Sequence, residues 1–254
     1  MKDLISILLP TRGRPNFMET MIFSAIDLAK DKNNLEFILY MDFDDHDSHK
    51  KLAEIHSKFN NVTGIMGTRT PTGIVNLSAM WNECYRLSRG SIAMHAGDDI
   101  IFRTQDWDEV VRNKFNEYED KIIFAYGDDG NPDYRNEDNS RSTFGTHGFL
   151  HRNWIHAVGY FVPPYFSSDY NDTWLNEVSR LINRDVYIDI LTEHMHPSLG
   201  KHDWDTTHQE RIHRAGNPGE GQVTPTQIYE MTKGERFKDA EKLLKVISNH
   251  RNDQ

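Results

Sequence analysis

Features that would assign this sequence directly to a class of protein are scarce. Its 254 residues contain one cysteine, Cys84, which excludes an internal disulfide framework and a zinc finger built on cysteines. No apolar run approaches the roughly 18 residues of a membrane-spanning helix. The run from Ile5 to Leu9 contains Ser6 and ends at Pro10, so it is too short for a secretory signal peptide. These absences predict a soluble, cytoplasmic protein.

Basic charge is also in short supply. The chain has 39 acidic and 29 basic residues, and its formal net charge is −10. A surface with this balance repels polyanions, so we expect no broad basic face for nucleic acid. The 13 Phe, 10 Tyr and 5 Trp argue against disorder, because such side chains supply apolar area for a core.

Short apolar runs alternate with helical spacing along the first hundred residues. Runs at residues 4–9, 35–41, 62–66 and 91–95 predict strands, and apolar positions at residues 16–29 and 77–87 predict helices between them. Strand and helix in alternation predict an α/β fold, a mostly parallel sheet with helices on both faces. Ligands of such sheets bind beyond the carboxyl ends of the strands.

The second half of the chain is less regular. Helices are expected at residues 107–118 and 172–183, and strands at residues 122–126, 149–151 and 186–191. Residues 127–142 predict a surface loop, and residues 197–226, with Gly, Pro, His and few apolar positions, predict a mobile one. Phe237, Ala240, Leu244 and Ile247 predict the apolar face of a last helix that packs on the domain.

Carboxylates rather than glycines follow the predicted strands. The turn at residues 10–15 lacks a G-x-G-x-x-G pattern, and the chain has no Walker A sequence. Asp42 and Asp44 follow the second strand, and Asp98 and Asp99 follow the fourth. Adjacent carboxylates repel each other unless a cation lies beside them, and a hard divalent ion suits oxygen ligands. The alternative is that the pair caps the next turn through backbone amides.

Six short motifs follow one another along the first hundred residues. They are Leu8–Arg12, Asp42 with Asp44, Thr72–Asn76, Trp81–Glu83, Ser88–Gly90 and Asp98–Asp99. In this order they resemble the nucleotide half of GT-A-fold glycosyltransferases, most closely the inverting family-2 type. The resemblance covers roughly residues 4–196. It implies a GT-A-like domain over residues 1–196, with a nucleotide-binding half at 1–103 and an acceptor-side half at 104–196. Residues 197–254 then form the mobile loop and last helix.

The resemblance implies a nucleotide-sugar donor and an Mn²⁺ or Mg²⁺ ion. Asp99 is the implied metal ligand, and Gly97 stands where the family has the first Asp of its D-x-D triplet. The implied donor-binding residues are Pro10, Thr11, Arg12, Asp42, Asp44, Gly73, Asn76 and Asp98. For Thr11 and Arg12, an ordinary strand-to-helix turn remains the alternative.

Two further sets of residues follow from the same resemblance. Asn171-Asp172 matches the family's Glu-Asp before an acceptor-side helix, which makes Asp172 the implied catalytic base and Asp169 the substitute. A carboxylate can take the proton of an attacking hydroxyl, although Asp172 also suits a helix N-cap. His194 and His196 match a late metal-binding histidine, and His196 is preferred because it lies closest to the start of the loop. For His194, the alternative is a buried, hydrogen-bonded imidazole.

The implied function is a metal-dependent hexosyl- or pentosyltransferase that moves a sugar from a nucleotide-diphosphate donor to an acceptor hydroxyl with inversion. Three other readings stay open: a nucleotidyltransferase, a non-catalytic nucleotide- or sugar-binding module, and a zinc hydrolase built on His194, His196 and His202. The acceptor is open too, among a glycan, a lipid-linked sugar, a protein and a modified nucleobase.

Overall fold

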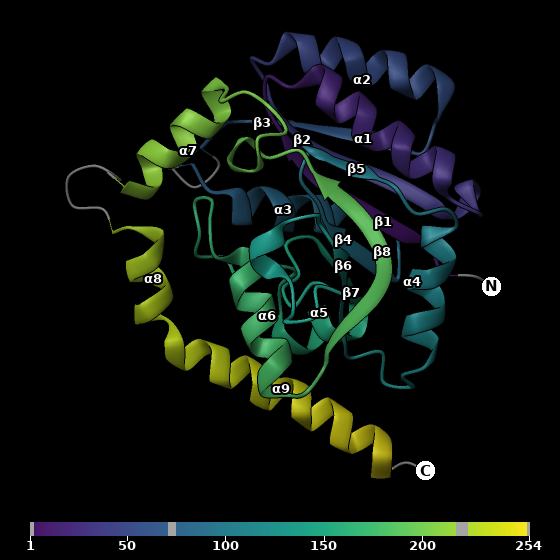
Figure 1. Ribbon diagram of the computed structural model, residues 1–254, viewed down its shortest axis with the longest axis vertical. Coiled ribbons are helices and arrows are strands. Elements are labelled where there is room, and N and C mark those ends of the chain that lie inside the picture. The colour runs from purple at the N-terminus through teal and green to yellow at the C-terminus, as the bar shows by residue number, and fades with distance from the viewer. Residues whose placement is uncertain (1–2, 71–74, 217–222, 253–254) are drawn as a thin grey trace.

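The computed structural model describes residues 3–70, 75–216 and 223–252. Within these ranges, eight strands form one curled sheet in the order β3-β2-β1-β4-β7-β6-β8-β5 (Figure 1). The strands are β1 (Ile5–Thr11), β2 (Leu35–Asp42), β3 (Val62–Gly67), β4 (Ile92–His95), β5 (Ile100–Phe102), β6 (Phe124–Asp128), β7 (Gly148–His151) and β8 (Asp185–His194).

Most of the strand pairs are parallel, as the sequence predicts. β1 pairs in parallel with β2 and β4, β2 with β3, and β6 with β8. The short strand β7 runs antiparallel to both β4 and β6, and β5 runs antiparallel to β8. The carboxyl ends of β1, β2 and β4 therefore lie at the same edge of the sheet as the start of β7.

Helices cover both faces of the sheet. They are α1 (Pro15–Leu28), α2 (His46–Lys58), α3 (Leu77–Leu87), α4 (Trp107–Asn116), α5 (Arg152–Val158), α6 (Asn171–Leu181), α7 (Thr206–Gly216), α8 (Pro225–Met231) and α9 (Lys233–Asn252). Short 3₁₀ turns occur at Lys32–Asn34, Pro132–Tyr134 and Pro197–Leu199.

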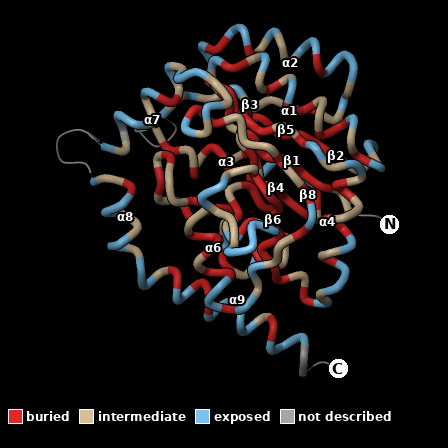
Figure 2. Tube along the Cα trace, in the orientation of Figure 1, coloured by how far each residue is buried: buried red, intermediate tan, exposed pale blue. Residues whose placement is uncertain are grey.

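Two hydrophobic clusters fill the space between sheet and helices. Side chains alternate along a strand, so Ile7 and Leu9 of β1 pack in the cluster under α1, α2 and α4. Leu8 belongs to the second cluster, with α3, α5, α6 and α9. Because both faces are covered there, β2, β4 and β6 are buried along their length (Figure 2).

The loop expected over residues 197–226 is in large part helical, because α7 and the start of α8 lie within it. Helix α7 has few apolar residues, so its sequence gives little helical signal. Asp205, directly before it, forms an ion pair with Arg14, and this tertiary contact holds its first turn. Helix α8 begins with a capping box between Thr224 and Gln227.

The last helix packs on its neighbours through a face that shares Ala240 and Ile247 with the predicted one and differs in the rest. Helix α9 lies against α5 and α6 (Figure 1), and its buried apolar residues are Ala240, Leu243 and Ile247. Phe237 and Leu244, which the sequence places on that face, are exposed. The helix is rotated because Arg236 is buried, with its guanidinium 3.7 Å from the centre of the Tyr229 ring.

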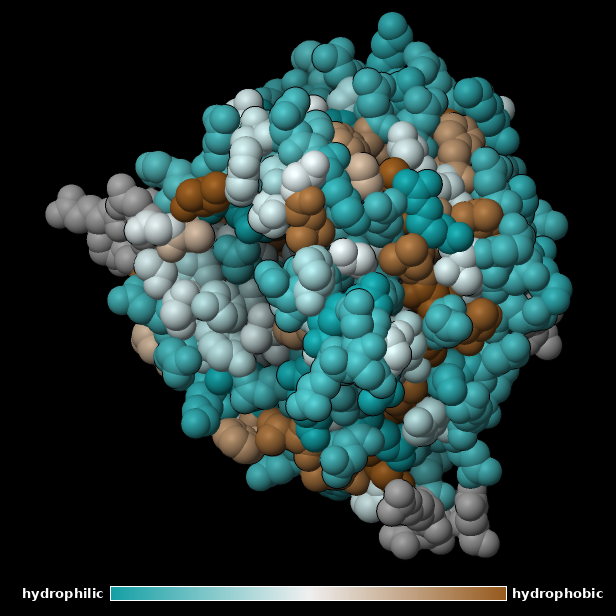
Figure 3. Space-filling model, viewed as in Figure 1, coloured by the Kyte–Doolittle hydropathy of each residue, from teal (hydrophilic) through white to brown (hydrophobic). Residues whose placement is uncertain are grey.

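The face of the molecule drawn in Figure 3 is mostly polar. In Figure 3, the hydrophobic side chains on the visible face form small separate groups among hydrophilic ones. None of the helices in the described ranges combines the length and apolar character that a membrane-spanning helix requires.

Candidate active site

A cavity of about 650 Å³ lies at the carboxyl edge of the sheet. Its walls come from the ends of β1, β2, β4 and β8, the start of α6, and α7. Most of the residues singled out from the sequence line it: Pro10, Thr11, Arg12, Asp42, Asp98, Asp99, Asp169, Asp172, His194 and His196. Asp44 and Asn76 are outside the lining, and Gly73 lies outside the described residues.

The acidic pair after β4 is buried at the floor of this cavity. The Thr11 hydroxyl donates to Asp98 Oδ2 at 2.7 Å, and Arg14 Nη1 lies 2.9 Å from Asp98 Oδ1. The same Arg14 nitrogen lies 3.6 Å from Asp99 Oδ2. These partners are side chains rather than backbone amides of the next turn, which argues against the capping alternative.

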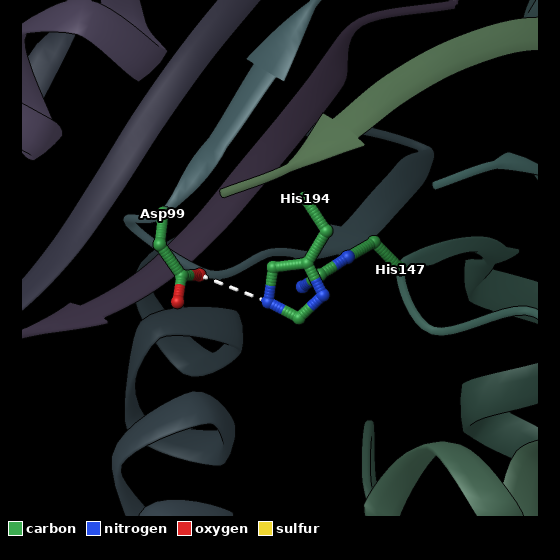
Figure 4. Close-up of side chains that lie close together, drawn as sticks. All are labelled: Asp99, His147 and His194. Atoms are coloured by element: carbon green, nitrogen blue, oxygen red, sulfur yellow. Dashed lines mark ion pairs between the residues drawn. The ribbon is translucent and has the colours of Figure 1, made fainter. Parts of the chain in front are cut away.

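Two histidines point at Asp99 and form with it a possible metal site. Asp99, His147 and His194 each offer one ligand atom, and these atoms lie within 4.8 Å of one another (Figure 4). His194, at the end of β8, has its Nε2 3.4 Å from Asp99 Oδ1. The rings of His147 and His194 are 5.0 Å apart and nearly perpendicular.

His147 does not follow from the sequence reasoning. It directly precedes β7, and because β7 is antiparallel to β4, its first residues lie at the carboxyl edge of β4. Had the sequence reasoning recognised that β7 runs antiparallel to β4, it could have placed His147 at the site. His147 Nδ1 is buried and has no hydrogen-bond partner among the described residues, and burial holds the pKa of this ring well below its ordinary value. The neutral ring therefore has a free lone pair.

His196 lies nearby but outside the group of three. Its Nδ1 accepts from the backbone N–H of Ser198 and is 2.7 Å from the hydroxyl of the same residue. The side chain thereby caps the 3₁₀ turn at Pro197–Leu199. Burial lowers the pKa of His196 to about 4.

The two buried aspartates differ in their electrostatics. Burial raises the pKa of Asp98, with Arg14 opposing that rise. Burial acts on Asp99 in the same direction, but the contacts with His194 and His208 outweigh it and hold the pKa of Asp99 well below its ordinary value. Asp99 is therefore ionised at neutral pH, as a cation ligand must be.

Helix α7 closes over this centre through charged contacts. Asp205 Oδ2 lies 2.6 Å from Arg14 Nε, and His208 Nε2 lies 3.6 Å from Asp99 Oδ2. Arg14 also donates to the His208 ring. Arg14 thus joins the turn after β1, the acidic pair and α7, although the sequence reasoning did not single it out.

The turn after β1 and the end of β2 form a charged wall. Arg12 Nη1 lies 2.6 Å from Asp42 Oδ2 and 2.6 Å from Asp44 Oδ1. Asp42 is buried and lines the cavity, whereas the Asp44 side chain is 53% exposed. Asn76 is the N-cap of α3 and accepts from the backbone N–H of Ala79, so its observed role is structural.

Asp172 lies on another wall, in the first turn of α6. The N-cap of this helix is Tyr170, so the N-cap alternative for Asp172 is wrong. The backbone N–H of Thr173 donates to Asp172 Oδ1 at 2.7 Å. Burial raises the pKa of this carboxyl to about 6. Asp169 lines the same cavity, with Arg211 Nε 3.6 Å away.

No protein-family model and no curated protein matches the sequence. Solved structures do. The mannosyltransferase PcManGT from Pyrobaculum calidifontis, in complex with GDP-Man and Mn²⁺, is 9% identical with a TM-score of 0.58, over 100% of this chain and 76% of that one. S. aureus TarS 1–349 in complex with UDP is 13% identical with a TM-score of 0.57, over 100% and 92%. At these identities the likeness shows a shared fold, and it confirms the α/β fold of the GT-A type.

Proposed function

We propose that this protein is a metal-dependent glycosyltransferase, hexosyl- or pentosyl-, that moves a sugar from a nucleotide-diphosphate donor to an acceptor hydroxyl with inversion. One observation carries the proposal. The same cavity holds three side chains whose ligand atoms lie close enough to hold one metal ion, those of Asp99, His147 and His194, and a separate carboxyl, Asp172, whose pKa is raised by burial to about 6. The likeness to a fold that binds GDP-Man with Mn²⁺ in PcManGT, and UDP in TarS, supports this assignment.

The residues present fit a divalent ion. The His147 ring has a buried Nδ1 without a partner in the described chain, and one of its nitrogens lies within 4.8 Å of the ligand atoms of Asp99 and His194. Asp99 is held in its ionised form by its neighbours. Imidazole nitrogens suit transition metals better than Mg²⁺, so two histidines favour Mn²⁺ of the two expected ions. His194 rather than the sequence-preferred His196 is the proposed ligand, because His196 lies outside the group of three. A bound divalent ion supplies positive charge that stabilises a departing nucleoside diphosphate.

The donor would lie along the wall from β1 to β4. Asp42, with its carboxylate held by Arg12, is positioned to accept hydrogen bonds from a nucleotide base. Thr11 and Asp98, hydrogen-bonded to each other, would contact the ribose. Pro10 adds an apolar part of the lining. These assignments follow the resemblance to the family, and the cavity supports them by bringing the residues together.

Asp172 is the base of the proposed reaction. The acceptor hydroxyl oxygen attacks the anomeric carbon while the bond from that carbon to the diphosphate oxygen breaks. The hydroxyl proton passes to the Asp172 carboxylate. This single displacement needs no covalent intermediate between sugar and protein. The Thr173 N–H bond to Oδ1 orients the carboxylate. Asp169, beside Arg211, is the alternative base.

The test is the release of nucleoside diphosphate from a panel of UDP-, GDP- and dTDP-sugars with Mn²⁺. We expect one donor to be turned over, and both Asp99→Asn and Asp172→Asn to lose turnover. Only Asp99→Asn should also lose the Mn²⁺-dependent thermal shift. Asp47→Asn, at an exposed position of α2, is the matched control. Release of pyrophosphate instead would indicate a nucleotidyltransferase, and binding without any release would indicate a non-catalytic module.

A further inference from the structure

A second cavity of about 340 Å³ continues the active-site cavity outward along α6. The two cavities share Phe144 and Thr173 in their linings. Thr173 is the residue after the proposed base, so the second cavity begins beside the reacting centre. Its remaining lining residues are Glu177, Arg180 and Leu181 of α6 and Tyr229 of α8.

Aromatic rings line the passage between the two cavities. Tyr134 and Phe144 have ring centres 4.6 Å apart, and Tyr170 and Tyr229 stack at 4.8 Å. Tyr134 and Tyr170 line the active-site cavity, Tyr229 lines the second cavity, and Phe144 lines both. An aromatic surface therefore passes from one cavity into the next on two sides.

Polar groups stand beside these rings. Glu177 accepts a hydrogen bond from the Tyr229 hydroxyl and forms an ion pair with Arg236. Arg180 is exposed, and its Nε lies 3.9 Å from Asp185. The Tyr229 ring is itself packed between neighbours, with the Arg236 guanidinium 3.7 Å from its centre and Tyr170 stacked at 4.8 Å. A sugar ring has C–H groups that pack on apolar lining such as Phe144 and Leu181, and a rim of hydroxyls that carboxylates, guanidinium groups and a tyrosine edge can bind.

Charge favours an uncharged ligand at this place. The arginines along the path are both near carboxylates, Arg211 beside Asp169 and Arg180 beside Asp185. Asp172 adds a further acidic group at the junction of the two cavities. An anionic ligand would have to displace these pairs, whereas a neutral saccharide can hydrogen-bond to them as they are.

We propose that the second cavity is an acceptor subsite, which binds the sugar ring next to the one that receives the transferred unit. The acceptor is then a glycan of at least two linked rings rather than a single small molecule. This inference rests on the proposed function, since it takes Asp172 as the base that faces the acceptor hydroxyl.

The test compares acceptors of different length on the full chain with Mn²⁺ and UDP or GDP present. The probes are glucose with cellobiose, mannose with mannobiose, and N-acetylglucosamine with chitobiose, and their dissociation constants are measured by titration calorimetry. We expect at least one disaccharide to bind tenfold or more tightly than its monosaccharide. Equal affinity within all three pairs overturns the proposal.

Variants locate the gain in the second cavity. Tyr229→Ala removes the ring and should abolish the preference for the disaccharide, whereas Tyr229→Phe keeps the ring and should retain it. Arg180→Ala should weaken disaccharide binding. It also removes a hydrogen bond to the Thr143 carbonyl, so its melting temperature is compared with that of Arg86→Ala, the exposed control on α3. A preference that survives both alanine variants at full size contradicts the assignment.

Donor binding distinguishes a failure of the acceptor subsite from a failure of the proposed function. The Mn²⁺-dependent thermal shift with nucleoside diphosphate should be unchanged in Arg180→Ala, because this residue does not line the active-site cavity. If that shift is intact while disaccharides bind no better than monosaccharides, only the subsite fails. If the shift and donor turnover are both missing from the unaltered protein, the proposed function itself fails.

Discussion

The two carboxylate centres of the cavity are built in opposite ways. Asp99 has charged and aromatic neighbours on several sides, with His194, His208 and Arg14 at 3.4 to 3.6 Å, and its pKa is held low despite burial. Asp172 is held by the N–H and hydroxyl of Thr173, and burial raises its pKa to about 6. Two aspartates of one cavity therefore have pKa values shifted in opposite directions, downward for Asp99 and upward for Asp172.

The difference separates two chemical tasks. A carboxylate that binds a cation must stay ionised, and the contacts around Asp99 achieve that. A general base works best when its pKa lies near the working pH, and the environment of Asp172 brings its pKa toward that range. The neighbours of each aspartate, rather than its residue type, thus indicate its role.

The largest effect is expected on turnover in Asp172→Asn. Losing the proton acceptor should slow the chemical step by about 100- to 10,000-fold. The Thr173 N–H can still donate to the amide oxygen, so the local structure should be kept. Single-turnover rates measure the chemical step, and the Mn²⁺-dependent binding of nucleoside diphosphate shows whether the donor site is intact. A variant that keeps full activity would transfer the role of base to Asp169.

Arg14→Met removes the cation that joins Asp98, Asp99 and Asp205. Breaking a buried ion pair typically costs about 3–5 kcal/mol, because the partner charges are left uncompensated. Urea unfolding with and without Mn²⁺ measures this loss. We expect Mn²⁺ to recover more stability in this variant than in the unaltered protein, since the ion replaces part of the missing charge. Arg86→Met, at an exposed position, is the control. Equal stability of the two variants would contradict the central place of Arg14.

His147→Ala tests the metal side alone. The unaltered protein at 100 times the Mn²⁺ dissociation constant should gain about 2.7 kcal/mol of unfolding free energy. His147→Ala should lose most of that gain, and His56→Ala, at a histidine outside the cavity, should keep it. An undiminished Mn²⁺ effect in His147→Ala would remove this residue from the metal site.

Asp172→Asn should also raise stability. Folding raises the pKa of this carboxyl from 3.8 to about 6, so the folded state favours the protonated form. The ionised carboxylate therefore costs stability, increasingly from pH 4 to pH 6 and fully above that range. Replacing it should stabilise the fold by roughly 1–3 kcal/mol at pH 7. The gain should vanish near pH 4 in urea unfolding. A gain that is the same at both pH values would contradict the raised pKa.

The smallest expected effect is that of moderate acidification on the unaltered enzyme. Below about pH 6, kcat/KM should fall by about tenfold for each pH unit as Asp172 becomes protonated. Initial rates between pH 5 and 7.5 at saturating Mn²⁺ measure this. A flat profile down to pH 5 would mean that Asp172 is not the base in that range.

The first half of the chain was predictable because its signals are local. Apolar runs closed by polar turns set the strands, and parallel pairing then brings Asp42, Asp98 and Thr11 to one edge. The second half depends on tertiary contacts that one sequence does not reveal. His147 reaches the site through an antiparallel strand, and α7 is held by Asp205 on Arg14, far away in the sequence.

Buried polar groups caused the remaining differences. The face of α9 was predicted from apolar spacing, but Arg236 is buried against Tyr229 and turns the helix. Asp172 could have been an N-cap from its position alone, and the structure assigns the cap to Tyr170, two residues earlier, which has a left-handed backbone. Such partners are specific to the folded chain, so spacing patterns do not predict them.

The most direct measurement is a crystal structure of the protein with Mn²⁺ and a nucleoside diphosphate, with anomalous data at the manganese edge. We predict an anomalous peak within ligand distance of Asp99, His147 and His194, and a diphosphate beside it in the cavity that Asp172 also lines. A nucleotide bound elsewhere, or manganese held away from these three side chains, would contradict the proposed active site.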